Sequence, residues 1–118
     1  MTKEELQDKT KQYALGIIKL IRALPKTLEG RAIGSQLIRC GTSVAANYRA
    51  VCRSRSRAEF ISKLGIVIEE ADESIFWMEI IIESGLVKKE LLQDLIKEGN
   101  EILSIMVSSS KSASKKKS

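Results

Sequence analysis

Four segments whose apolar residues recur every three or four positions restrict the fold of this chain more than any other feature. This spacing places the apolar side chains on one face of an α-helix. The segments cover residues 3–24, 28–53, 57–84 and 88–107, with only short links between them. Helices of about twenty residues joined by such links must fold back on one another. The sequence therefore predicts an all-α fold, an antiparallel four-helix bundle with up-down-up-down topology.

Residues that start or stop helices set the limits of these segments. Pro25 ends the first segment, because proline lacks the N–H that a helix interior needs, and Thr27 is a candidate N-cap for the second. Ser56 and Glu59 have the spacing of a capping box, so we expect the third helix to begin directly after Ser56. Gly85 supplies a C-terminal stop. These signals and the apolar periodicity predict the same four helices.

The chain of 118 residues is long enough for one hydrophobic core and too short for two. We expect the bundle to occupy residues 1–107. A serine- and lysine-rich tail at residues 108–118 has too few apolar groups to pack, so we expect it to be disordered. No apolar run is long enough for a membrane span, and the first ten residues lack the character of a signal peptide. The expected location is therefore cytoplasmic, without membrane contact.

Two pairs of small residues on the second helix carry further expectations. Gly34 and Gly41 lie in mid-helix, where each costs about 1 kcal/mol relative to alanine. Their place on the apolar side favours a close approach of a neighbouring helix, with a ligand or backbone contact as the alternative. Cys40 and Cys52 lie about 18 Å apart along the helix, which is too far for a disulfide. We expect two free thiols, buried or half-buried.

The charged residues are segregated along the chain. Residues 31–57 carry six arginines and no acid, whereas residues 58–110 carry four bases and eleven acids. Arginines of the second helix occupy an arc of roughly 80°, largely opposite its apolar line. They are Arg31, Arg39, Arg49 and Arg53. A face of one sign indicates a negative partner, which is either a nucleic acid or the acidic half of the protein itself, within one chain or between copies.

The third segment has more apolar residues than one core face needs. The surplus residues point mostly to the far side of the helix, with Glu69 and Glu73 between them. They are Ile66, Phe76, Trp77 and Ile80. Because an exposed apolar stripe usually marks a protein contact, we expect these four residues to form the interface of a homo-oligomer. The alternative is that Trp77 folds over onto a neighbouring helix of its own bundle.

The sequence lacks the residues that most catalytic and metal sites need. It contains no histidine, which excludes a His general base, Ser/His and Cys/His pairs, His metal sites and the Glu-x-x-His motif of di-iron bundles. Glycine-rich phosphate loops are missing, and neither cysteine has an activating partner. The acids of residues 69–83 are spread around the exposed side, as on a solvated face. We therefore expect no enzymatic activity, no cofactor and no metal.

Three runs in the second and third helices are similar to motifs of a bacterial four-helix-bundle family. That family was first noticed in proteins encoded by intervening sequences inside 23S ribosomal RNA genes and is sometimes labelled S23 ribosomal protein. The runs are RCGTSVAANYRAV at residues 39–51, RSRAEFISKL at 55–64 and EEADESIFW at 69–77. With compatible first and fourth helices, the resemblance extends to about residue 107.

The resemblance implies a small cytosolic bundle that assembles into a homopentameric ring. It also implies, for some relatives, an accessory role to retroelement reverse transcriptases, in which a basic surface of the ring binds nucleic acid. Carried over to this chain, the partners would be RNA or DNA, further copies of the chain, and a reverse transcriptase or another protein. The basic surface would comprise Arg39, Arg49, Arg53, Arg55 and Arg57, flanked by Arg31 and Lys63.

Two functions follow from these observations. The first is an oligomeric accessory protein that binds nucleic acid, RNA above all, through arginines that bond phosphate oxygens without reading sequence. The second is a homo-oligomeric scaffold whose arginines pair with acids of its own or a partner subunit, such as Glu69, Glu70, Asp72 or Glu79. The lysines of the tail either add attraction to nucleic acid or keep the protein soluble. We expect the nucleic-acid site at the turn between the second and third helices, where local acids are few.

Overall fold

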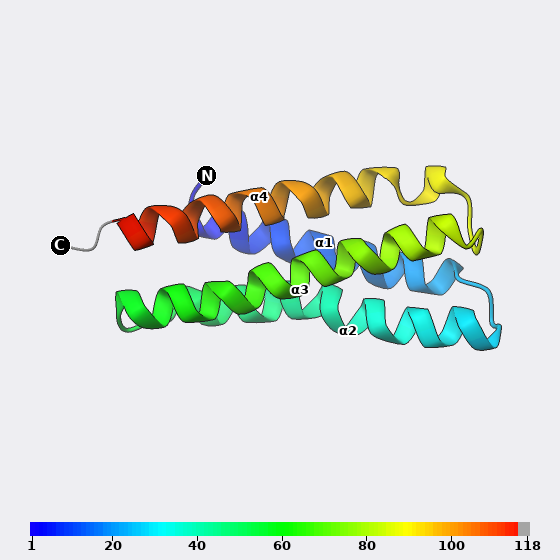
Figure 1. Cartoon of the computed structure of the whole chain (residues 1–118), viewed down its shortest axis with the longest axis horizontal. Helices are drawn as coiled ribbons and strands as arrows, with labels where there is room; N and C mark the ends of the chain where they lie inside the picture. The colour runs from blue at the N-terminus through cyan, green and yellow to red at the C-terminus, as the bar shows by residue number, and fades with distance from the viewer. Residues whose placement is uncertain (116–118) are drawn as a thin grey trace.

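The computed structural model of the chain describes residues 1–115 and consists of four long helices joined by short links. Successive helices run in opposite directions along a body of 52 × 20 × 19 Å (Figure 1). The elements are α1 (Lys3–Ala23), α2 (Leu28–Val51), α3 (Arg57–Glu83), the 3₁₀ turn η1 (Lys89–Leu91) and α4 (Gln93–Lys115). The predicted antiparallel four-helix bundle is confirmed.

The helices begin where side chains satisfy their first backbone N–H groups. Thr2 and Glu5 form a capping box at α1, since each side chain accepts from the other's backbone N–H. The hydroxyl of Thr27 accepts from the backbone N–H of Gly30 at 3.1 Å, and Ser56 does the same for Glu59 at 3.1 Å. The N-caps predicted for α2 and α3 are therefore confirmed.

The core lies between the apolar faces of all four helices. Its fully buried residues follow the three- and four-residue spacing seen in the sequence. The largest are Tyr13, Ile17, Leu37, Leu64, Met78, Ile81, Leu92, Ile102 and Met106. The buried hydroxyl of Ser74 donates to the Ala71 carbonyl and shares a 2.7 Å hydrogen bond with the Tyr13 hydroxyl, so this polar pair is satisfied inside the core.

The mid-helix glycines of α2 admit a neighbouring helix, as expected. A Cβ atom placed at Gly41 would lie 2.8 Å from Cγ1 of Ile17, well inside van der Waals contact. At Gly34 the nearest atom to such a Cβ would be Cδ1 of Leu24, at 3.1 Å. Ile17 lies within α1 and Leu24 caps its C-terminal end. The helices α1 and α2 therefore pack closely because α2 lacks side chains at these two positions.

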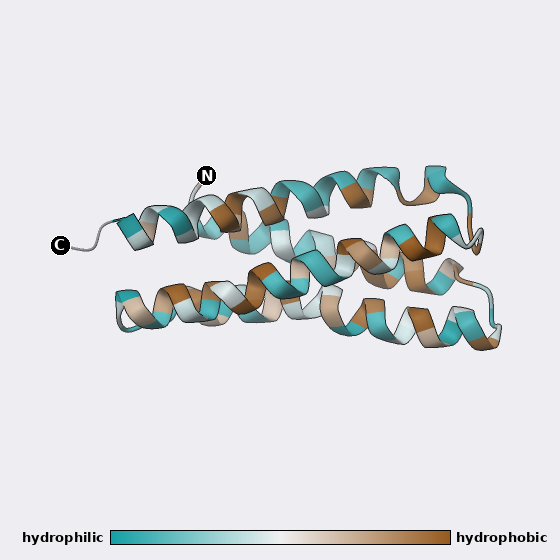
Figure 2. Cartoon of the chain, viewed as in Figure 1, coloured by the Kyte–Doolittle hydropathy of each residue, from teal (hydrophilic) through white to brown (hydrophobic). Residues whose placement is uncertain are grey.

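The expectation of a disordered tail from residue 108 is wrong for residues 108–115. These residues continue α4 to Lys115, and Ser109, Ser110 and Ala113 are half-buried. One side of this stretch and the first turns of α3 line a common hollow, while its outer side is hydrophilic (Figure 2). Residues 116–118 lie outside the described part of the chain. The fourth helix also starts later than expected, at Gln93, because residues 89–91 form the separate 3₁₀ turn.

Candidate nucleic-acid interface

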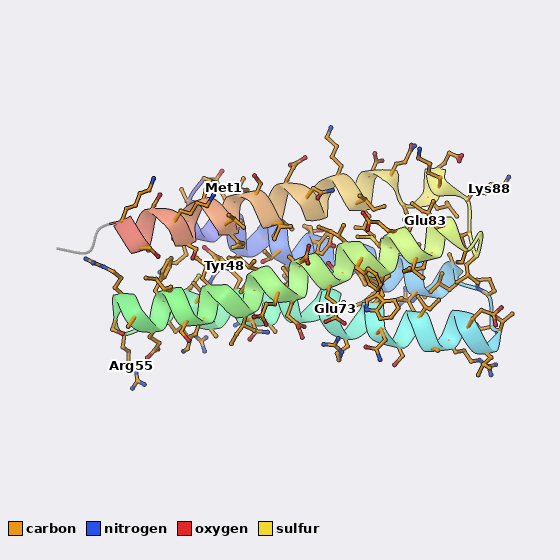
Figure 3. The ribbon with its side chains drawn as sticks, viewed as in Figure 1. Met1, Tyr48, Arg55, Glu73, Glu83 and Lys88 are labelled. Carbon is orange, nitrogen blue, oxygen red and sulfur yellow. The ribbon has the colours of Figure 1, made fainter. Side chains whose placement is uncertain are left out.

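The turn between α2 and α3 gathers arginines at one end of the bundle. Figure 1 shows this turn at the same end as the chain's N-terminus and the last turns of α4, and Figure 3 shows Arg55 projecting outward from it. The turn is shaped locally, since the hydroxyl of Ser54 donates to the Val51 carbonyl at 2.7 Å. We call the surface formed by Arg49, Arg53, Arg55, Arg57, Lys111 and Lys115 the cationic end.

Arg39 lies apart from the cationic end and is paired. It is ten residues before Arg49, about 15 Å along α2, and its guanidinium contacts the carboxylates of Glu70 and Glu73 on α3. The indole N–H of Trp77 donates to the same Glu73 carboxylate at 3.0 Å. These two donors, the indole first, hold the pKa of Glu73 below its ordinary value. Arg39 therefore links α2 to α3 by ion pairs. For this arginine, the negative partner is the acidic part of the protein itself.

Arg49 and Arg53 have no acidic partner among residues 1–115, and both side chains are exposed. They lie on one face of α2, one turn apart, and line a groove of about 760 Å³ between α2 and α1. Lys11 of α1 faces the same groove, and Asp8 is its one acidic lining residue within the described chain. The other α2 residues that line the groove have small side chains; they are Thr42, Ala45 and Ala46. An extended anion therefore meets three cations, one carboxylate and little steric hindrance.

Arg55 is tied only loosely to the bundle. Its side chain is 88% exposed, and its Nε lies 3.7 Å from a carboxylate oxygen of Glu59. That carboxylate is engaged more closely by Lys63 at 3.0 Å, and this contact is the main cause of the lowered pKa of Glu59. Lys63, expected as a flank of the basic surface, is therefore partly neutralised, while Arg55 reaches into solvent.

Arg57 opens α3 and borders a hollow of about 420 Å³. Phe60 lies beside it on α3, and the opposite wall is α4. The residues of that wall are Ser108, Ser109, Ser112 and Ala113. Because this wall belongs to the stretch expected to be disordered, the sequence pattern indicates neither the hollow nor a site role for Phe60 and the serines.

Lys111 and Lys115 belong to the cationic end because α4 carries them there. Both are exposed and lie one helical turn apart. Arg31, in contrast, lies near the opposite end of α2, where it lines a small hollow with Pro25 and Gly30. The structure thus places four of the five arginines expected to bind nucleic acid at one end of the bundle, Arg49 and Arg53 at the α1–α2 groove and Arg57 at the α3–α4 hollow. Two lysines of α4 lie at the same end, whereas Arg39 and Arg31 lie away from it.

Burial holds two polar groups of the core in their protonated forms. Burial raises the pKa of the Cys40 thiol to about 12, so it stays protonated at neutral pH. Burial likewise raises the pKa of the core residue Tyr13 to about 12. In the part of the chain that the structure describes, no three acidic or cysteine side chains are grouped to hold a metal ion. Nor does any described helix have an apolar stretch sufficient to cross a membrane.

The apolar stripe of α3 divides into two parts. Ile66 and Phe76 are 44% and 48% exposed, as expected of an interface. Trp77 instead packs on the core of its own bundle, which was the alternative expectation. Its ring is edge-on to that of Phe76, with a distance of 5.0 Å between the ring centroids. Ile80 is half-buried. The stripe therefore retains two large exposed apolar groups, flanked by the exposed acids Glu69 and Asp72.

Comparison with known proteins decides the family. The sequence profile of the 23S rRNA-intervening sequence protein family matches residues 2–108. The chain belongs to the 23S rRNA-intervening sequence protein family. A crystal structure from Bacteroides thetaiotaomicron VPI-5482, a protein of unknown function from the S23 ribosomal protein family, is 31% identical, covers 94% of this chain and 99% of its own, and superposes with a TM-score of 0.86. No curated protein matches the chain.

Membership of the 23S rRNA-intervening sequence protein family accounts for the fold and leaves the activity open. The family profile matches the chain only up to residue 108. Most of the α4 residues that line the hollow beside Arg57 therefore lie beyond the matched region. Within the matched part lie Arg49, Arg53, Arg55 and Arg57. The arginine cluster is therefore part of the family region of this chain, and the lysines of α4 are an addition to it.

Proposed function

We propose that the protein is a non-enzymatic, cytoplasmic nucleic-acid-binding protein that holds the phosphates of RNA, or of DNA, at its cationic end. The observation that carries the proposal is the groove between α1 and α2, in which Arg49 and Arg53 face Lys11 without an acidic partner in residues 1–115. Like charges one helical turn apart destabilise a helix by about 0.2–0.5 kcal/mol, and a bound phosphate removes that repulsion. Guanidinium groups also bond two phosphate oxygens at once.

Contacts of this kind give affinity without reading sequence. Phosphate contacts fix the position of a protein on the nucleic acid, whereas base identity is read by contacts to base edges. The lining of the α1–α2 groove supplies cations and small side chains, which suits a backbone. By contrast, a groove of about 590 Å³ between α1 and α4 is lined by Glu90, Asp94 and Glu98, with Lys19 as its cation within the described chain. That groove repels phosphate, so the proposed path follows α2.

Assembly would strengthen the binding. We propose a homo-oligomer, a pentameric ring by family resemblance, that uses the exposed Ile66 and Phe76 of α3 as part of its interface. A ring repeats the cationic end in every subunit and so multiplies its field. The pairing of Arg39 with Glu70 and Glu73 favours a second candidate, a scaffold that binds a protein partner such as a reverse transcriptase through the same charged faces.

The two candidates differ in how binding responds to salt. Fluorescence anisotropy with labelled single-stranded RNA, structured RNA and DNA, run at increasing salt, measures the slope of log affinity against log salt concentration. We expect a steep slope, and we expect the double variant Arg49→Ala, Arg53→Ala to reduce it by about 1.4 on a single strand, about 0.7 for each phosphate that is no longer neutralised. The matched control is Arg22→Ala, Arg31→Ala, two exposed arginines away from the cationic end.

The control should bind as the wild type does. Failure of every nucleic acid to bind at low salt would leave the scaffold as the better account. An equal loss of affinity in the control and the double variant would show that net charge, and not the groove, determines binding.

A further inference from the structure

The hollow beside Arg57 is a notch in the end of the bundle. Figure 1 shows the first turns of α3 and the last turns of α4 projecting past the start of α1, so α1 does not fill the space between them. We call this space the end notch. It has a volume of about 420 Å³, within the range of small-molecule sites, and it is lined by Arg57, Phe60, Ser108, Ser109, Ser112 and Ala113.

The lining combines an aromatic ring with polar donors. Phe60 is half-buried: part of its ring packs on the core, and part lines the notch. Three serines of α4 line the opposite wall, and Arg57 also lines the notch. An aromatic ring with one accessible side is a platform for a nucleobase, and hydroxyl groups can donate to or accept from the polar edge of that base.

The elements that border the notch carry further cations. Arg53 and Arg55 lie in the turn that leads into α3, and Lys111 and Lys115 lie on the exposed side of α4. A base placed in the notch therefore has cations on both of the helices that border it. This charge complementarity favours a nucleotide over an apolar side chain of a protein partner, which would bring no negative charge.

We propose that the end notch takes one unpaired base of a single-stranded nucleic acid, stacked on Phe60, while the cationic end holds the adjoining phosphates. The inference rests on the proposed function and makes it more specific, because the bases of a duplex are already stacked and paired and cannot enter the notch. The protein should therefore bind a single strand more tightly than a duplex of the same length.

Two variants alter the notch without removing a charge. Phe60→Leu removes the aromatic ring and keeps an apolar side chain on the core, and Ser112→Leu places a bulky group into the notch from an exposed position on α4. Their matched control is Ser104→Leu, at an exposed serine of α4 that does not line the notch.

The probes are a twelve-residue single-stranded RNA, the same strand with abasic sugars, and the corresponding duplex. Both notch variants should weaken binding of the base-bearing strand by about fivefold or more, as expected when one base no longer stacks, and should leave the abasic strand unaffected. The salt slope should not change, since every phosphate-binding cation is retained. A third variant, Phe60→Trp, should retain binding, and its fluorescence should be quenched by a stacked base.

The outcomes separate this inference from the function on which it rests. If no nucleic acid binds to the wild type, the proposed function itself fails. If binding depends on Arg49 and Arg53 but Phe60→Leu and Ser112→Leu bind every probe as the wild type does, the notch holds no base and only this inference is overturned. This inference is also overturned if the notch variants lose as much affinity for the abasic strand as for the base-bearing strand. The same holds if the fluorescence of the Phe60→Trp variant is not quenched by the base-bearing strand. Thermal melting followed by circular dichroism checks that each variant folds. If Phe60→Leu does not fold, the variants Ser112→Leu and Phe60→Trp are sufficient for the test.

Discussion

Replacing Gly41 by alanine tests how tightly α1 and α2 are packed. The new methyl group would lie 2.8, 3.0 and 3.3 Å from three atoms of Ile17, where ordinary contacts are about 3.5–4.0 Å. Ile17 is fully buried and β-branched, so its side chain cannot rotate away. Overpacking of this kind costs about 1–3 kcal/mol, and the higher helix propensity of alanine returns about 1 kcal/mol. We therefore expect Gly41→Ala to lower the free energy of unfolding by up to about 2 kcal/mol.

The sign of the effect should reverse when Ile17 is truncated. Ile17→Ala alone should cost about 2–5 kcal/mol, because it leaves a cavity. In that background the methyl group of Gly41→Ala no longer meets the isoleucine, so the same change should stabilise the protein through helix propensity. Gly65→Ala on α3 is the matched control: a Cβ there meets nothing within 4 Å, and the variant should be more stable than the wild type by about 0.5–1 kcal/mol.

Urea unfolding followed by circular dichroism at one fixed protein concentration measures all four variants. The reasoning would be refuted if Gly41→Ala were as stable as Gly65→Ala, or if its effect were the same with isoleucine and with alanine at position 17. Either result would show that the two helices move apart at little cost.

Two further predictions concern charge and the end of α4. The indole of Trp77 and the guanidinium of Arg39 lower the pKa of Glu73, so the stabilisation that they give is present at neutral pH and should be lost as the pH falls below the ordinary value of 4.5. Urea unfolding followed by tryptophan fluorescence measures this loss of stability in acid. The loss should be smaller in Glu73→Gln and unchanged in Glu79→Gln. Truncation after Val107 removes the helical residues 108–115, so the far-ultraviolet helical signal per molecule should fall; an unchanged signal would mean that this segment is not helical in solution.

The periodicity of the sequence was sufficient for the fold because each helix buries one continuous face. The N-caps Thr27 and Ser56 and the close contacts at Gly34 and Gly41 could also be predicted, since they depend on local spacing or on which face a glycine occupies. These features are set within one helix, and the 3.6-residue repeat of that helix is enough to place them.

Partners on different helices could not be predicted in the same way. The pairing of Arg39 with Glu70 and Glu73 depends on how α2 and α3 are rotated against each other, which the helical period alone does not fix. The end notch depends on the relative lengths of α1, α3 and α4, and the partial burial of Ser109, Ser110 and Ala113 depends on neighbouring helices. The composition of that stretch, rich in serine and lysine, indicates disorder only when no neighbour is considered.

An even number of antiparallel helices returns the chain to the end from which it started, and here that is the cationic end (Figure 1). Any segment fused to either terminus, including a purification tag, therefore emerges beside the proposed binding surface and can screen it or compete for it. The exposed link around Gly85 lies at the far end, near Glu83 and Lys88 (Figure 3). A dye or a surface tether attached at that link would leave the binding surface facing solution.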